Sequence, residues 1–186
     1  MEFEESNSVR VVITMQNGKQ MLFELFPDRA PITVANFLAL IGRRFYDGLT
    51  FHRVVRDYVI QGGSANNSCI CPTESTIIGE FAENGYDTGV RHTRGTISMA
   101  RDEDFNSAGT QFFVVHRDAV QLDGRYAAFG RLLSGFDVLD AIAAVETAPP
   151  DEENRPLTPQ VIASIRLDPT DLPRIDGAMG DIEAGR

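Results

Sequence analysis

Apolar and polar residues alternate over two short stretches near the start of the chain, residues 9–15 and 21–25. Alternation with a period of two places successive side chains on opposite faces of a β-strand. Asn17 and Gly18 lie between the stretches, and Asn-Gly is the pair that favours a tight hairpin turn. The pattern therefore predicts two antiparallel strands joined at this turn.

Two later stretches follow the helical period instead. In the first, apolar residues recur at i, i+3, i+4 and i+7: Val34, Phe37, Leu38 and Ile41. In the second, the same spacing joins another set: Val138, Ala141, Ile142 and Val145. Pro31 suits the first turn of the earlier helix and Gly42 suits its end. We therefore predict two short amphipathic helices, each with one face on an apolar surface.

The remaining β-rich segments make the chain mainly β. They span residues 51–60, 96–100, 111–116, 126–133 and 161–167. Arg53, Val55 and Ile60 cannot all face one side of a flat strand, so a bend or bulge is expected near Asp57. Strands and helices do not alternate regularly, which argues against a parallel doubly wound sheet. We predict a mostly antiparallel barrel or sandwich whose open ends are covered by the two helices.

Length and charge narrow the class of protein. The chain has 186 residues, enough for one domain, with a formal net charge of -10 and a pI of about 4.7. An acidic surface repels phosphate groups, so neither nucleic acid nor an anionic membrane is an expected partner. No apolar run approaches the roughly 20 residues that span a bilayer, and the first residues lack the pattern of a secretion signal. We expect a soluble, monomeric, cytoplasmic protein.

The cysteines exclude a disulfide framework, because only Cys69 and Cys71 are present. A structural zinc site needs about four Cys or His ligands, and no histidine lies at ligand spacing from this pair. We therefore expect no metal and no other cofactor, and free thiols in a reducing compartment.

The C-terminal residues 168–186 hold five acidic residues against two arginines and few large apolar groups. Such a segment buries too little surface to order itself. We expect a domain over residues 1–167 followed by a flexible acidic tail over residues 168–186.

The stretch from 51 to 63 is the first with candidate chemistry. It places Arg53 among β-branched and aromatic residues and ends in Gln61 and two glycines. A lone arginine in a strand is usually exposed on its polar face. Within an apolar run it is costly to desolvate unless it has a partner or faces a groove. This stretch alone does not show whether Arg53 is functional, so the other motifs of the chain must be considered with it.

Two further stretches favour a functional role for Arg53. Residues 94–101 are followed by residues 106–114, where Gln111 and Phe113 share a strand face. That pairing suits a pocket that holds a ring and hydrogen-bonds a peptide backbone. The third stretch, residues 122–130, makes a tight Asp-Gly turn into an apolar strand.

In order and approximate spacing, these blocks resemble the signature of the cyclophilin-type peptidyl-prolyl cis-trans isomerases. The matching phrases are Phe-His-Arg-Val-Val through Gln-Gly-Gly, Ser-Met-Ala followed by Gly-Thr-Gln-Phe-Phe, and Leu-Asp-Gly through Phe-Gly. The resemblance extends from about Val9 to Leu167. It implies a closed eight-stranded antiparallel β-barrel capped by two α-helices. It also implies an enzyme without a cofactor that assists protein folding, with proline-containing peptides and unfolded or flexible protein segments as partners.

Residue by residue, the resemblance makes Arg53 the main catalytic residue, with Gln61 and Phe113 beside it. The substrate groove would be lined by residues from all three blocks: His52, Val55, Tyr58, Ala100, Arg101, Gln111, Gln121, Leu122 and Tyr126. Within this set, Tyr58 and Leu122 would join Phe113 to form the pocket for the proline ring.

Some positions depart from the family pattern. Gln121 stands where many eukaryotic members carry tryptophan, Tyr126 where they carry histidine, and Arg101 where asparagine is usual. Gln121 lacks the indole N–H and its apolar face, so we predict weak binding of the cyclic peptide cyclosporin. The acidic residues 102–104 and the phrase at 92–95 resemble small bacterial members instead.

Two other functions stay open on the sequence. A proline-peptide binding module with little catalysis would share the groove. Members that lose activity often lose the catalytic arginine or the pocket aromatic, and here both Arg53 and Phe113 are present. A barrel of unrelated function would have to match three ordered motifs by chance. A peptide isomerisation assay with an Arg53→Ala control separates an isomerase from a binding module.

Overall fold

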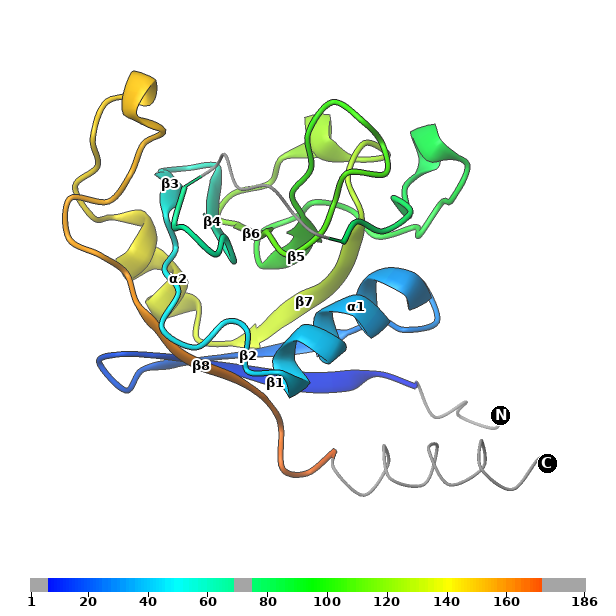
Figure 1. Cartoon of the computed structure of the whole chain (residues 1–186), viewed down its shortest axis with the longest axis horizontal. Coiled ribbons are helices and arrows are strands. Elements are labelled where there is room, and N and C mark those ends of the chain that lie inside the picture. The colour runs from blue at the N-terminus through cyan, green and yellow to red at the C-terminus, as the bar shows by residue number, and fades with distance from the viewer. Residues whose placement is uncertain (1–6, 69–74, 172–186) are drawn as a thin grey trace.

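The computed structural model describes residues 7–68 and 75–171 (Figure 1). Its strands are β1 (Val9–Met15), β2 (Gln20–Leu25), β3 (Arg53–Val55), β4 (Val59–Gly62), β5 (Thr96–Met99), β6 (Phe112–Val115), β7 (Ala128–Ser134) and β8 (Ile162–Leu167). Its helices are α1 (Pro31–Gly42) and α2 (Phe136–Ala143), with short 3-10 turns η1 (Ala82–Asn84), η2 (Val120–Leu122) and η3 (Pro150–Glu152). The mainly β class predicted from the sequence is confirmed.

All eight strands form one antiparallel sheet in the order β3-β4-β6-β5-β7-β2-β1-β8. The prediction of a closed barrel is wrong, because the two outer strands, β3 and β8, do not pair and the sheet is open and curled. The chain before β3 meets the start of β8 at an isolated bridge between Thr50 and Val161 and through a backbone hydrogen bond from Gly48 to Ile162 at 2.9 Å. The physical reason is that residues 48–51, not β3, face β8, and the turns over residues 43–48 before them give no continuous strand there.

The two turns predicted from the sequence lie where expected. The β1–β2 hairpin pairs Ile13 with Met21 and Thr14 with Gln20 around the Asn-Gly turn. Gly18 has a φ of 81°, a left-handed conformation that glycine adopts without a steric cost. The bend near Asp57 is also present, with a φ of 60° at that residue between β3 and β4.

Both predicted helices are present, with shifts in the buried faces. Leu40 is buried on α1, whereas Leu38 is only partly buried. On α2, Ala141 is exposed, and Leu139 and Ala143 are buried beside the predicted Val138 and Ile142; Val145 lies beyond the helix end. The spacing rule gives the period but not the centre of the buried stripe, which depends on the neighbouring strands. Here α1 packs against β8, and α2 against β2, β3 and β4.

A carboxylate from a distant loop caps the start of α1. Glu80, buried with 3% exposure, accepts hydrogen bonds from the backbone N–H groups of Ile32 (3.1 Å) and Thr33 (2.8 Å). The Thr33 hydroxyl donates a third bond at 2.7 Å. Ala30 at the N-cap position has no polar side chain to do this, so Glu80 supplies the missing acceptor.

The apolar residues divide into two clusters. The larger one lies between the sheet and the helices, and it includes Phe112 and Val114 of β6. The smaller one contains Phe113 and Val115 of the same strand, with Val59, Ala119 and Leu122. Strand β6 is therefore buried on both faces, and its second face builds the site described below.

The first residues of the predicted tail pack on β1. Asp171, 1% exposed, accepts hydrogen bonds from the Arg10 backbone N–H (2.6 Å) and from its guanidinium (3.2 and 3.0 Å). The rest of the predicted tail lies outside the described residues, as do Cys69 and Cys71.

No helix within residues 7–68 and 75–171 is long and apolar enough to cross a membrane. In the same described ranges, no three His, Cys, Asp or Glu side chains gather as a metal site would require.

Candidate active site

The β3–β4 hairpin places Arg53 directly opposite Gln61. The two residues are register partners, and the Arg53 Nη1 donates to Gln61 Oε1 at 3.2 Å. Asp57 in the left-handed conformation turns the chain back on itself, which brings the two ends of the predicted motif together. Hairpin geometry therefore sets the guanidinium beside the amide.

A second glutamine extends this polar row. Gln61 Nε2 donates to Gln111 Oε1 at 3.0 Å. Strands β4 and β6 are adjacent, with Gln61 opposite Phe113. The arrangement holds three polar side chains, Arg53, Gln61 and Gln111, in sequence along one edge of the small apolar cluster, where hydrogen bonds keep their orientations fixed.

Beside this row lies a cavity of about 170 Å³. Its lining combines two members of the polar row with apolar and aromatic groups: Arg53, Tyr58, Val59, Gln61, Ala100, Arg101, Phe113, Leu122 and Tyr126. Phe113 is buried, and the Tyr126 ring meets it edge-on with centroids 5.7 Å apart. Drug-sized ligands occupy roughly 300–1,000 Å³, so this cavity suits one small ring.

His92 supports the Phe113 ring from behind. The two rings stack with centroids 5.9 Å apart and an interplanar angle of 20°. The imidazole nitrogens lie 3.1 Å from Asp123 Oδ1 and 3.0 Å from Ser98 Oγ. Burial lowers the pKa of His92, and the Asp123 carboxylate opposes that effect. This held ring gives Phe113 a rigid backing, which sequence reasoning missed.

Arg101 lines one side of the cavity, and its guanidinium is held there by backbone carbonyl oxygens and aromatic rings. Its Nε and Nη2 donate to the carbonyl oxygen of Arg125 at 3.1 and 2.9 Å. Its Nη1 donates to the carbonyl oxygens of Asp102 (2.8 Å) and Glu103 (3.2 Å). The guanidinium also lies 4.9 Å from the ring centroids of each of three aromatic residues: Phe81, Phe105 and Tyr126. These contacts use N–H donors of Arg101 and hold the loops around residues 102 and 125 at the edge of the cavity.

Comparison with known proteins decides the family. Residues 10–167 match the family described as cyclophilin type peptidyl-prolyl cis-trans isomerase/CLD. The chain belongs to this family. Peptidyl-prolyl cis-trans isomerase A of Dickeya dadantii is 34% identical over 171 residues, covering 89% of this chain and 87% of the relative. Peptidyl-prolyl cis-trans isomerase cyp18 of Streptomyces antibioticus is 37% identical over 162 residues, covering 80% and 92%.

A solved cyclophilin has a similar fold. The cyclophilin type isomerase of Cryptosporidium parvum, crystallised in the presence of the dipeptide Ala-Pro, superposes with a TM-score of 0.76 at 27% identity. The match covers 86% of this chain and 98% of that protein. The chain described here is therefore a cyclophilin-type isomerase in both sequence and fold.

Most of the residues that the sequence assigned to this cyclophilin's site meet at the cavity. Those that line it or bond to its lining are Arg53, Tyr58, Gln61, Ala100, Arg101, Gln111, Phe113, Leu122 and Tyr126. Val59 also lines the cavity, and sequence reasoning missed it. Its burial in the small cluster could have been expected from its place in an apolar run next to Tyr58.

Besides Gln111, which bonds to Gln61 without lining the cavity, three of the assigned residues lie outside the cavity lining. Gln121 is exposed on η2, and Val55 is half-buried at the end of β3. His52 is 2% exposed, and its ring nitrogens make no hydrogen bond of good geometry, although Gln111 lies close by. Burial lowers the pKa of His52, against an opposing effect of the Glu153 carboxylate. His52 immediately precedes β3 and is buried, so it is not part of the hydrogen-bonded row of Arg53, Gln61 and Gln111.

Proposed function

We propose that this cyclophilin accelerates rotation about Xaa-Pro bonds by binding the twisted amide at Arg53 while the apolar cavity holds the proline ring. The observation that supports this most directly is one contact: the guanidinium of Arg53, oriented by Gln61 at 3.2 Å, stands at the edge of a cavity sized for one ring.

The energetic task explains why an arginine in this place suffices. Amide resonance opposes rotation with a barrier of roughly 18–20 kcal/mol, and the uncatalysed reaction at proline takes tens to hundreds of seconds. No covalent bond breaks, so the enzyme has only to bind the twisted amide more tightly than either planar form. As resonance is lost, the lone pair localises on the prolyl nitrogen, and a guanidinium N–H can donate to it. A fixed donor of this kind can contribute about 3 kcal/mol in a partly dry site.

The other residues of the site would bind the proline ring and orient the peptide backbone. Phe113, Leu122 and Tyr58 would contact the pyrrolidine ring, while Gln61 and Gln111 would hydrogen-bond the peptide backbone on either side of proline. Anchoring the ring leaves the preceding residue free to rotate, which is the motion that the reaction needs. The substrates we propose are proline-containing peptides and flexible or unfolded protein segments, and the biological role is assistance in protein folding.

Cyclosporin binding follows the same reasoning. Gln121 is exposed and lies outside the cavity lining, so it offers neither an apolar face nor an indole N–H to a cyclic peptide at the rim. Weak binding of cyclosporin remains our proposal.

The test is the rate of cis-to-trans relaxation of a short Xaa-Pro peptide. Wild type should accelerate it, and Arg53→Ala should lower kcat/KM by about 100-fold or more, as loss of a preorganised donor does. Arg56→Ala is the matched control, because Arg56 is exposed three residues away and does not line the cavity; its kcat/KM should stay within about twofold of wild type. If the folded wild type binds proline peptides but does not accelerate relaxation, the protein is a binding module instead.

A further inference from the structure

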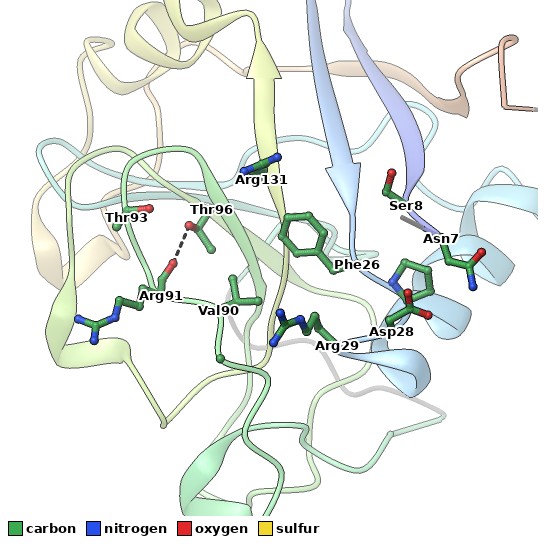
Figure 2. Close-up of a pocket in the computed structure, with 12 residues that line it drawn as sticks. Asn7, Ser8, Phe26, Asp28, Arg29, Val90, Arg91, Thr93, Thr96 and Arg131 are labelled. Atoms are coloured by element: carbon green, nitrogen blue, oxygen red, sulfur yellow. Dashed lines mark hydrogen bonds between the residues drawn. The ribbon is translucent and has the colours of Figure 1, made fainter. Parts of the chain in front are cut away.

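A second cavity lies away from the isomerase site, between the end of β2, the start of β1 and the loop that leads into β5 (Figure 2). Its volume is about 500 Å³, against about 170 Å³ for the isomerase cavity. The residues that line it are Asn7, Ser8, Phe26, Pro27, Asp28, Arg29, Gly89, Val90, Arg91, Thr93, Thr96 and Arg131. None of them lines the isomerase cavity, so the mechanism proposed above does not use this space.

An aromatic ring forms the centre of this cavity. Figure 2 shows the half-buried Phe26 with Arg131 above it and Arg29 below it. The Arg131 guanidinium lies 5.7 Å from the Phe26 ring centroid, and Glu24 pairs with it at 2.8 Å. Arg131 is therefore engaged by Glu24 and by one side of the ring, so we look to Arg29 and Arg91 for a ligand.

The guanidinium of Arg29 lies close to the backbone of Gly89. A Cβ atom on Gly89 would come within 3.3 Å of Arg29 Nη1, and Gly89 has a φ of +65° that favours glycine. The loop can therefore approach the guanidinium closely. In the part of the chain that the structure describes, no hydrogen bond or ion pair engages the guanidinium of Arg29 or that of Arg91.

Unpaired arginines are informative in an acidic protein. The chain has 27 acidic against 17 basic residues, and several of its arginines reach a carboxylate, as Arg94 does with Asp140 and Arg166 with Asp47. Around this cavity the balance is reversed, because three arginines line it and Asp28 is its sole acidic lining residue among those described. A guanidinium presents paired N–H groups that match the oxygen atoms of phosphate or carboxylate.

We propose that this second cavity binds a small ligand in which an oxyanion, phosphate or carboxylate, is attached to an aromatic or similarly flat apolar group. Arg29 receives the oxyanion, and Arg91 adds positive charge on the other side of Val90. The apolar group packs on Phe26, and the side chains of Asn7, Ser8 and Thr93 offer further hydrogen-bond donors. The volume falls within the range typical of small-molecule sites, roughly 300–1,000 Å³.

The experiment is an NMR titration of the isotope-labelled full chain at constant ionic strength. The probes are phenyl phosphate, benzoate, inorganic phosphate and benzyl alcohol, which separate the charge from the ring and phosphate from carboxylate. We expect phenyl phosphate or benzoate to shift the amide signals of residues 26–29 and 89–93 saturably, and to bind more tightly than inorganic phosphate or benzyl alcohol. Arg29→Gln should weaken binding by about tenfold, the effect of losing one charge-assisted contact.

Two further variants make the test specific. Arg43→Gln removes an exposed arginine on the far end of α1 that does not line the cavity, and it should leave the affinity unchanged. Arg91→Gln provides a second reading if Arg29→Gln fails to fold, and it should also weaken binding. Isomerase activity should survive in all three variants and serves as the check of folding. Shifts that do not saturate, or an equal loss of affinity in Arg43→Gln, would overturn the proposal.

Discussion

At the scale of single residues, Arg101 shows how the meaning of a position depends on its surroundings. From the resemblance it was a substrate-binding residue. The structure shows its guanidinium bonded to three backbone carbonyl oxygens, those of Asp102, Glu103 and Arg125. It also lies over Tyr126, which in turn packs edge-on against Phe113. We expect Arg101 to act on the proline pocket through these neighbours, as a positioning residue.

This role predicts a pattern of kinetic effects. Arg101→Lys keeps the charge but loses the planar fork, so it should raise KM several-fold while kcat changes little, and Arg101→Ala, which loses all of these contacts, should raise KM at least as much. Either change should reduce the free energy of unfolding by about 1 kcal/mol. Steady-state assays and denaturant titrations measure these quantities. Arg125→Lys is the control, because Arg101 bonds only to the backbone carbonyl oxygen of Arg125, which this change keeps. A similar KM in the Arg101→Lys and Arg125→Lys variants would contradict the role of Arg101.

The buried histidines predict how stability depends on pH. Burial lowers the pKa of His92 and His52 in the folded chain, whereas an unfolded histidine titrates near about 6.5. Below that value the unfolded state binds protons that the folded state does not, so stability falls as the pH drops. The free energy of unfolding should be at its full value above about pH 6.5 and should decrease between about pH 6.5 and 5.5.

Urea titrations at several pH values test this expectation. The carboxylates whose pKa is lowered, such as Asp47 and Asp140, lose their contribution only in more acidic solution, so they do not confound this window. Replacing His92 or His52 with Gln should flatten the profile, and a wild-type profile that is already flat down to about pH 5.5 would contradict the argument.

At the scale of elements, α1 depends on a partner far away in the sequence. Its first turn has no polar N-cap side chain, and the Glu80 carboxylate takes that place with three hydrogen bonds. Glu80→Ala would leave buried donors without an acceptor, which costs about 2 kcal/mol of unfolding free energy. Denaturant unfolding measures it. Glu83→Ala, an exposed acid three residues on, should cost less than about 0.5 kcal/mol, and equal losses would show that the cap is unimportant.

The β3–β4 hairpin illustrates an element that could be predicted with its chemistry. The break in alternation indicated a bend near Asp57, and the fold of the hairpin then forces Arg53 and Gln61 to face each other. The pairing of Gln111 with Phe113 on one strand face was also predicted from local alternation, and both lie at the site. These predictions held because each needs only the geometry of a strand or a turn.

At the scale of the whole molecule, the segment after β8 hydrogen-bonds to β1. Asp168 N–H donates to the Arg10 carbonyl oxygen at 2.8 Å, and buried Asp171 accepts from the Arg10 side chain. We expect a chain that ends at Asp171 to melt near the wild-type temperature. A chain that ends at Asp168 should melt at a lower temperature, because Arg10 loses its partner. Calorimetry of the two truncated chains measures this, and identical melting temperatures would show that the contact does not stabilise the domain.

The sequence by itself determined the local structure and the family. Period-two and helical spacing located the first hairpin and both helices, since such patterns report on neighbours a few residues apart. The ordered motifs identified the family and named Arg53, Gln61 and Phe113, because specific side chains at specific spacings carry that information.

Only the tertiary structure decided which distant groups meet. It left the sheet open where a closed barrel was predicted, since the segment before β3, residues 48–51, meets β8 at a single bridge and not as a strand. It placed Glu80 on α1, His92 behind Phe113, and Arg29 beside Phe26 over a second cavity. Such contacts join residues brought together by packing of the whole chain, and no local pattern specifies them. The physical reason is that hydrogen-bonding and stacking partners are chosen by distance in space, which sequence spacing does not measure.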